Sequence, residues 1–197
     1  MVESLYNKDS RRESIFLTAE KKLFGEDRRQ FLLNILMTSN SPITGADLAN
    51  KANVSRQVIV NDMTLLKAKN EPIVATSQGY IYLPHAHDNQ LFEKTIACFH
   101  TPEQAEEELN LIVDHGVTVK DVKIEHPVYG DLTASIMVSN RKDVKQFISK
   151  VKDTQAVYLS NLTHGVHIHT IVAKEEAQLH KVEEELKQAG YLINVQE

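Results

Sequence analysis

The pattern that most constrains the fold lies between residues 26 and 83, where helix caps and helix breakers follow one another closely. Apolar residues at helical spacing in the first part predict one helix of about three turns, which ends at residues 39–42. Thr44, with Asp47 in the capping-box position, predicts a second, short helix that ends near residue 53. The chain therefore turns within a few residues after the end of each helix.

A third helix and a hairpin complete this segment. Ser55 is the next good cap and starts a helix that extends to about Lys69, before Pro72 breaks it. Two short apolar runs, residues 73–75 and 80–83, flank a turn and predict a β-hairpin. Three helices and a hairpin in this order predict a winged helix-turn-helix.

The third helix carries side chains of the kind that contact DNA bases on the side opposite its apolar stripe. With the cap and the first turn, the predicted DNA-binding residues are Ser55, Arg56, Gln57, Val60, Asn61 and Thr64. Gln and Asn bind adenine through two hydrogen bonds, Val contacts a thymine methyl group, and Arg reaches guanine or phosphate. The other interpretation, an ordinary solvated helix face, leaves the short helix, the tight turn and the hairpin around it unexplained.

Charge separates the two halves of the chain, although the net charge of −5 argues against a nucleic-acid partner. Residues 26–83 hold six Lys/Arg and five Asp/Glu, whereas residues 91–197 hold eleven and seventeen. This difference fits a nucleic-acid module joined to an acidic regulatory one. Because the first half is only weakly basic, we expect a homodimer that presents two copies to a palindromic operator in double-stranded DNA.

The length of 197 residues suits two small domains. We predict a flexible extension over residues 1–24, the winged helix-turn-helix over 25–84 and a regulatory domain over 91–197, with a linker at 84–89. The regulatory domain is predicted to be α+β, with a mostly antiparallel sheet and helices on one side. Its predicted strands are residues 117–125, 132–138, 156–159, 166–173 and 191–195, and its predicted helices are residues 101–115, 141–152 and 175–189.

The sequence contains no apolar run near 18 residues and no leader, so we expect a cytoplasmic protein with no membrane segment. The single cysteine, Cys98, cannot form an internal disulfide, which agrees with a reducing compartment.

His167 and His169 occupy alternate positions of an apolar run that predicts a strand, so their imidazoles point to the same face. Such a pair is half of a metal site, or else a solvent-facing polar pair. His100 precedes a capped helix that carries Glu106, Glu107 and Glu108. Helical periodicity places Glu107 toward solvent, but it does not decide whether Glu106 or Glu108 faces the histidines. A carboxylate beside three imidazoles would suit zinc or another first-row divalent ion.

Residues 44–49 and 54–59 resemble the helix-turn-helix of many bacterial one-component regulators. Farther along, several motifs resemble, in order, the three-histidine regulatory domain of the nicotinate-responsive repressors of NAD biosynthesis in Gram-positive and related bacteria. These motifs are residues 100–102, 107–109, 114–117, 126–132 and 162–171.

The resemblance implies a DNA-binding repressor of genes for NAD biosynthesis and nicotinate uptake, with nicotinic acid as co-repressor. It also implies one divalent transition metal ion, zinc, nickel or similar, and it selects Glu108 among the glutamates. The metal ligands that it implies are His100, Glu108, His167 and His169.

Three residues are candidates for binding the effector. Arg141 is the only arginine after Arg56, and the carboxylate of nicotinate needs a positive partner. His126 and Tyr129 lie in a turn that either lines the effector pocket or forms a structural corner.

Two other functional classes compete with a nicotinate-responsive repressor. A metal-sensing regulator would use the ion itself as the signal, and a metal-dependent enzyme would use it to activate water. The chain contains no HExxH, GxSxG or P-loop motif, so we do not expect an enzyme.

Overall fold

The computed structural model describes residues 23–83 and 91–193. The expected linker at 84–89 and all but the last two residues of the expected extension over 1–24 lie outside the described residues. By their contacts, the described residues form two compact units, one with residues 23–38 and 45–71 and the other with residues 39–44 and 72–193. Within the described ranges, no helix is both long enough and apolar enough to cross a membrane.

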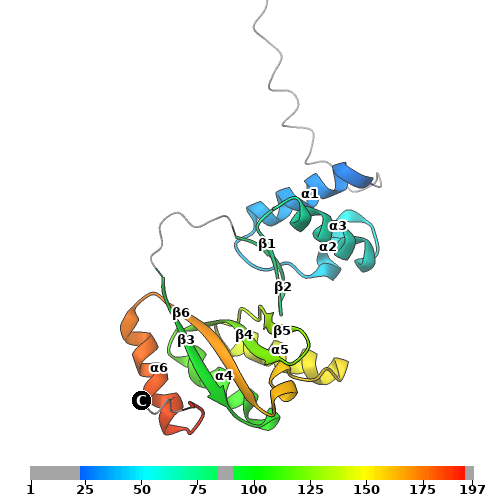
Figure 1. Ribbon diagram of the computed structural model, residues 1–197. Coiled ribbons are helices and arrows are strands. Elements are labelled where there is room, and N and C mark those ends of the chain that lie inside the picture. The colour runs from blue at the N-terminus through cyan, green and yellow to red at the C-terminus, as the bar shows by residue number, and fades with distance from the viewer. Residues whose placement is uncertain (1–22, 84–90, 194–197) are drawn as a thin grey trace, which may run out of the picture. The chain divides into compact units, whose positions relative to one another are not determined.

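The first unit consists of the three predicted helices, α1 (Gly25–Thr38), α2 (Gly45–Ala52) and α3 (Arg56–Ala68) (Figure 1). Ser55 caps α3, because its side chain accepts a hydrogen bond from the backbone N–H of Val58. In the turn between α2 and α3, Asn53 has φ 49°, a left-handed conformation that asparagine tolerates. The buried apolar residues of the unit include Leu32, Leu36, Leu48, Ile59, Met63 and Leu66.

An ion pair with a buried carboxylate fixes α3 against α1. Asp62 is only 2% exposed, and its two carboxylate oxygens accept hydrogen bonds from Arg28 Nε at 2.6 Å and from a terminal nitrogen of Arg28 at 3.2 Å. Arg29 adds a longer contact of 3.5 Å. Two bonds from one guanidinium define the angle between the helices more tightly than apolar packing alone.

The predicted hairpin is present as β1 (Ile73–Thr76) and β2 (Gly79–Tyr82), which pair antiparallel. Gly79 is required here, because it has φ 142° and a Cβ atom at this position would lie 2.3 Å from the carbonyl oxygen of Ile43. Ile43 in turn pairs with Tyr80, so the segment before α2 lies beside the hairpin. The order of three helices and a hairpin along the chain confirms the predicted helix-turn-helix class.

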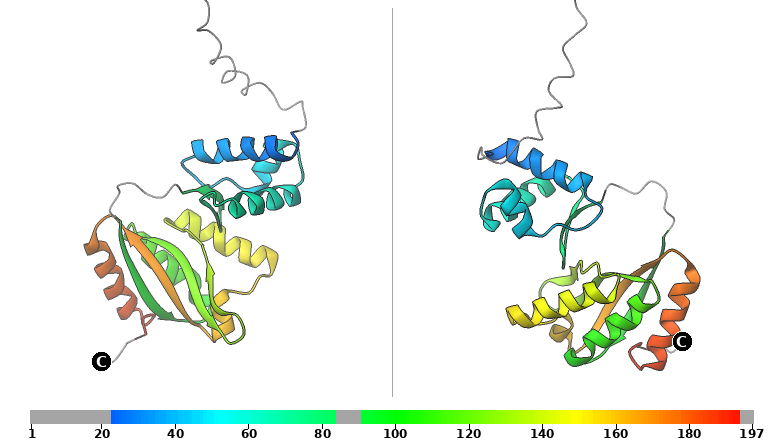
Figure 2. Two further views of the ribbon diagram at one scale, coloured as in Figure 1. Left: turned by 45° about the horizontal axis from the view of Figure 1, so that its top comes forward. Right: turned by 180° about the vertical axis from the view of Figure 1, so that it is seen from behind.

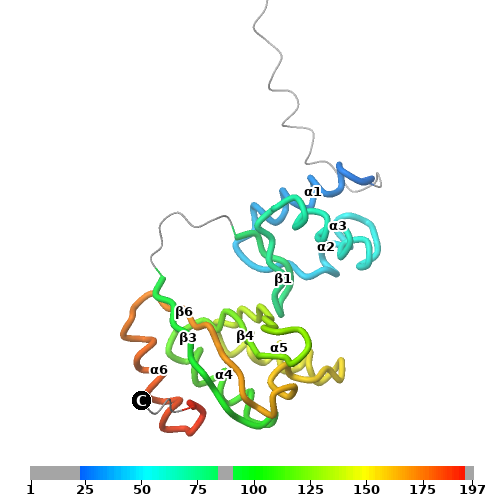
Figure 3. The backbone as a smooth tube through the Cα atoms, in the orientation of Figure 1, coloured from blue at the N-terminus to red at the C-terminus, as the bar shows by residue number. Residues whose placement is uncertain are grey.

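A four-stranded sheet forms the centre of the second unit. Its strands are β3 (Phe92–Phe99), β4 (Thr118–His126), β5 (Gly130–Ala134) and β6 (Val166–Ala173). They are antiparallel throughout and adopt the order β3-β6-β4-β5, so that β6 lies between β3 and β4 (Figure 3). This topology confirms the predicted antiparallel sheet.

Three helices, α4 (Ala105–Asp114), α5 (Arg141–Thr154) and α6 (Glu176–Gln188), cover one face of this sheet, as the view from behind in Figure 2 shows. Two short 3₁₀ helices, η1 (Pro102–Gln104) and η2 (Leu159–Thr163), precede α4 and β6. The core lies between the helices and the sheet, and the predicted α+β class is confirmed.

Some element predictions were wrong. Residues 156–159 form no strand, because Gln155 ends α5 with φ 53° and the chain then enters η2, with Tyr158 packed edge-on against Phe147. Residues 92–99, for which no element was predicted, form β3. In place of a final strand from residue 191, the described part of this segment shows an isolated bridge between Leu192 and Cys98.

Candidate functional site

The four side chains implied as metal ligands come together in the second unit. His167 and His169 lie on β6 and point toward α4, because alternate strand residues share a face. Thr101 and Pro102 start the turn that leads into α4, and this places Glu108 on the side of the helix that faces the sheet. All four residues are buried, whereas Glu106 and Glu107 are exposed.

The distances define a compact cluster around one carboxylate oxygen. Glu108 Oε2 lies 2.8 Å from His100 Nε2, 3.3 Å from His169 Nε2 and 3.5 Å from His167 Nε2. The Nε2 atoms of His167 and His169 are 3.1 Å apart. Four donor atoms at these separations can surround a single ion.

The backbone fixes which nitrogen of each ring faces the cluster. The Nδ1 atoms of His100, His167 and His169 lie at hydrogen-bond distance from the carbonyl oxygens of Thr101, Gly165 and Asp121, at 2.7, 2.9 and 2.9 Å respectively. Because a carbonyl oxygen only accepts, each Nδ1 carries the proton and each neutral ring turns its Nε2 lone pair inward. Four acceptors therefore converge without a donor, which is the arrangement that a cation stabilises.

Electrostatics in the metal-free protein point the same way. Burial lowers the pKa of His169, but the adjacent Glu108 carboxylate reverses this effect and leaves the pKa raised. The pKa of His100 is also raised, because the effect of the Glu108 carboxylate exceeds the lowering by burial. Burial raises the pKa of Glu108, but the three histidines hold it well below its usual range. The buried carboxylate thus favours positive charge at the ring nitrogens that face it, and the three nitrogen donors and one oxygen donor fit zinc or nickel.

Cys98 also reaches this cluster, which sequence reasoning missed. Its Sγ atom, a carboxylate oxygen of Glu108 and a ring nitrogen of His167 all lie within 4.8 Å of one another, and all three residues are buried. The signal in the sequence was the alternation of Cys98 with His100, but it has meaning only if residues 92–99 form a strand.

A small cavity adjoins the histidines. Its volume is about 40 Å³, and Phe147, Tyr158 and Ser160 line it together with the metal-ligand cluster. A space of this size holds roughly one water molecule. A pyridine ring with a carboxylate is much larger, so it could enter only if these side chains moved.

The structure does not bring the three expected effector contacts to this cavity. His126 and Tyr129 do not line it, and their rings lie with centroids 4.9 Å apart in the turn between β4 and β5. The Nδ1 atom of His126 accepts hydrogen bonds from the backbone N–H groups of Val128 and Tyr129, and Tyr129 is 73% exposed. This geometry is that of a structural corner.

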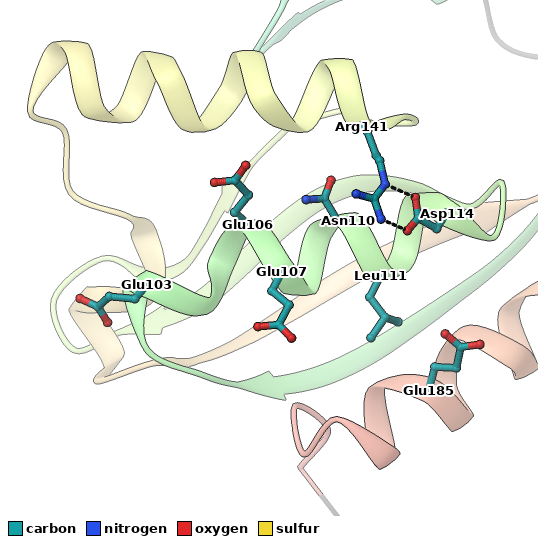
Figure 4. A pocket seen from close by; sticks show the side chains of 8 residues that line it. All are labelled: Glu103, Glu106, Glu107, Asn110, Leu111, Asp114, Arg141 and Glu185. Carbon is teal, nitrogen blue, oxygen red and sulfur yellow. Dashed lines mark hydrogen bonds and ion pairs between the residues drawn. The ribbon is translucent and has the colours of Figure 1, made fainter.

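Arg141 is engaged elsewhere. Its Nε atom donates to Asp114 Oδ1 at 2.6 Å across α4 and α5, and the pair lowers the pKa of Asp114 (Figure 4). The pair borders a cleft of about 500 Å³, whose other lining residues include Glu103, Glu106, Glu107 and Glu185. Carboxylates outnumber the single guanidinium in this cleft, and Asp114 already pairs with it, so the cleft disfavours an anionic ligand.

In the first unit, all six predicted DNA-binding residues are exposed on α3 or at its cap. The same helix buries Ile59, Met63 and Leu66, as its periodicity predicted. Gln57 Nε2 donates to Asn61 Oδ1 at 3.3 Å, so these two side chains lie together on the exposed face. The predicted base-contacting surface is thus accessible and continuous.

Comparison with known proteins agrees with both units. Residues 28–81 match the model of an HTH domain, and residues 93–195 match that of the 3H domain. The chain is 60% identical over 178 residues to the transcription repressor NadR of Bacillus subtilis, which covers 90% of this chain and 99% of that protein. It is 37% identical over 172 residues to the probable transcription repressor NiaR of Thermotoga maritima, which covers 87% of this chain and 97% of that protein. The chain therefore belongs to the family of DNA-binding transcription repressors that join an N-terminal helix-turn-helix domain to a C-terminal 3H domain.

Proposed function

We propose that this repressor controls genes for NAD biosynthesis and nicotinate uptake, with nicotinic acid as co-repressor and a divalent metal ion in the 3H domain. The observation that carries the proposal is the convergence of three Nε2 lone pairs and the Glu108 carboxylate at one buried point. Such a set suits a bound cation far better than a packed core.

In the proposed metal centre, His100, Glu108, His167 and His169 hold the ion, and hydrogen bonds from Nδ1 to the backbone keep the imidazoles oriented. A bound ion would supply a positive charge beside the cavity. The carboxylate or ring nitrogen of nicotinate would bind on that side, and Phe147 and Tyr158 would contact the pyridine ring.

Operator binding is assigned to the exposed face of α3. Gln57, Val60 and Asn61 would contact bases, Thr64 would extend that surface, and Ser55 and Arg56 would contact phosphate at the start of the helix. The weakly basic charge of residues 26–83 supports a homodimer that doubles the contact area on a palindromic operator.

The effector cavity links ligand binding to a conformational change. Because the cavity holds about 40 Å³, nicotinate must displace part of its wall. Tyr158 and Ser160 belong to the segment around η2, which leads directly into β6 and its two histidines. Movement of this segment would couple effector binding to the rest of the protein.

A DNA mobility-shift assay with purified protein and its own promoter tests the proposal. The expected result is a shift that appears with nicotinate, disappears after treatment with a chelator and returns when zinc or nickel is restored. Nicotinamide, which lacks the carboxylate, is the matched ligand control and should be much less effective.

Two outcomes would support other functions. A shift that follows metal concentration and ignores nicotinate would indicate a metal-sensing regulator. Conversion of a nicotinate-like compound without any DNA affinity would indicate a metal-dependent enzyme.

A further inference from the structure

Cys98, the single cysteine of the chain, is fully buried on the strand that precedes His100. In the sheet it is the direct register partner of His167, and both residues face the helices. The neighbouring residue Ala97 pairs with Ile168 and therefore faces the opposite side of the sheet.

The thiol lies close to two donor atoms of the proposed metal site. Its Sγ atom lies within 4.8 Å of both a Glu108 carboxylate oxygen and a ring nitrogen of His167. Donor atoms about 2.0–2.3 Å from a tetrahedral ion are roughly 3.3–3.8 Å apart, so side-chain movements of about 1 Å would bring the thiol into the coordination sphere. No change of strand register is needed.

A second observation is that one oxygen of the Glu108 carboxylate has no hydrogen-bond partner in the part of the chain that the structure describes. Glu108 is 1% exposed, and its Oε1 atom has no hydrogen-bond partner among the described residues. A buried carboxylate oxygen without a partner is costly, and an ion bound between it, the thiol and the imidazoles would remove that cost.

We propose that Cys98 is a ligand of the metal centre, which gives the centre a sulfur donor in addition to nitrogen and oxygen. The inference rests on the proposed metal site, and it adds a preference among metal ions. When the ion binds, a sulfur–metal bond forms and the thiol proton leaves to solvent. A thiolate favours zinc, cobalt and cadmium over magnesium and manganese.

The competing explanation is that Cys98 is a small apolar residue of the core. It does pack among the buried residues of the second unit, and a buried cysteine often has no other role. A spectroscopic test of the metal-loaded protein separates the two explanations, because a packing role contributes no sulfur–metal bond.

The experiment replaces the native ion in the full chain with Co²⁺ and records its absorption spectrum. The expected result is visible ligand-field bands together with a near-ultraviolet sulfur-to-cobalt charge-transfer band. X-ray absorption of the zinc form should show one sulfur at about 2.3 Å beside nitrogen and oxygen at about 2.0–2.2 Å. This measurement needs no substitution and so does not depend on how a variant folds.

Two variants complete the test. Cys98→Ala should remove the charge-transfer band, keep the visible bands and lower zinc affinity at least about tenfold. Adding Ala97→Cys to that variant restores one thiol on the other face of the same strand, and the band should stay absent.

Cobalt binding without the charge-transfer band, or a zinc spectrum without sulfur, would overturn the role of Cys98 and leave the histidine and glutamate centre intact. Absence of all visible cobalt bands would overturn the metal centre itself, and the role of Cys98 with it.

Discussion

The Nε2 atoms of His167 and His169 lie 3.1 Å apart, and the Nδ1 atom of each ring is bonded to a backbone carbonyl. When both rings are neutral, the lone pairs of their Nε2 atoms therefore face each other at close contact. The pair is stable only with a positive charge between the rings, supplied by a proton or by a metal ion. Metal binding should therefore change the stability of the protein and the dependence of that stability on pH.

Replacement of Glu108 with Gln should lower zinc affinity by at least about tenfold, because it removes the central negative donor but keeps the shape of the side chain. Isothermal titration calorimetry of chelator-treated protein measures the change. Glu106→Gln is the matched control on the same helix, and it should leave the affinity unchanged because Glu106 is exposed. An equal loss of zinc affinity in the two variants would contradict the assignment of Glu108 as a metal ligand.

The stability of metal-free protein should fall as the pH rises above neutrality. His100 and His169 have raised pKa values in the folded state, so their contribution is complete below the unfolded value of 6.5 and is lost as pH rises through the folded pKa. Glu108 acts in the other direction, because its lowered pKa contributes above 4.5 and the contribution is lost under acidic conditions.

Thermal unfolding at about pH 6 and about pH 8 checks this pH dependence. Chelator-treated protein should have the lower midpoint at the higher pH. Added zinc should raise the midpoint more at the higher pH, because the metal and the protons compete for the same Nε2 atoms. A midpoint that does not depend on pH in the metal-free protein would argue against the charged cluster.

Gly165→Ala should both destabilise the second unit and weaken metal binding. Gly165 has φ +98°, and a Cβ atom there would lie 2.5 Å from the carbonyl oxygen of His100. The comparison is with Gly190→Ala, since Gly190 has φ +80° but nothing within 4 Å of an added Cβ atom. Both variants incur the backbone strain, on the order of 1 kcal/mol, and only Gly165→Ala should also lower zinc affinity.

Asp62→Asn should destabilise the first unit by about 1.5–3 kcal/mol, because it leaves the partly buried Arg28 guanidinium without its charged partner. Urea unfolding followed by circular dichroism measures the loss. Asp27→Asn, at an exposed position of α1, should cost less than about 1 kcal/mol. A small effect at Asp62 would mean that apolar packing alone orients α3.

Gln57→Ala should weaken specific operator binding by about 1–3 kcal/mol and relax the base preference at one position of each half-site. Titration of DNA containing single-base changes provides the measurement. Gln30→Ala, an equally exposed glutamine on α1, serves as the control. If both variants bind every operator sequence equally well, α3 is not the recognition helix.

The first unit was predictable because its signals are local. A cap at Ser55, a break at Pro72 and the spacing of Ile59 and Met63 each specify structure within a few residues. The strand β3 was not predictable, because in the described part of the sheet it lies at the edge and pairs with β6, which begins more than 60 residues after β3 ends.

The candidate metal site was likewise predictable only where the signals are local. Alternation along β6 was enough to place His167 and His169 on one face. Helical periodicity could not choose between Glu106 and Glu108, because the rotation of α4 about its axis depends on its packing against the sheet. The proximity of Cys98 to the histidines was not predictable for a related reason, since it follows from the pairing of Cys98 with His167 across two strands.

The four side chains of the cluster come from the residue after β3, from α4 and from β6, so an ion bound there would cross-link segments that are distant in sequence. A ligand that binds only the folded chain stabilises it by mass action, by about 2.7 kcal/mol at a concentration one hundred times its Kd. Cellular proteases degrade chains in proportion to how often they unfold. The lifetime of this repressor in the cell should therefore lengthen with metal supply, and metal starvation would relieve repression by depleting the protein.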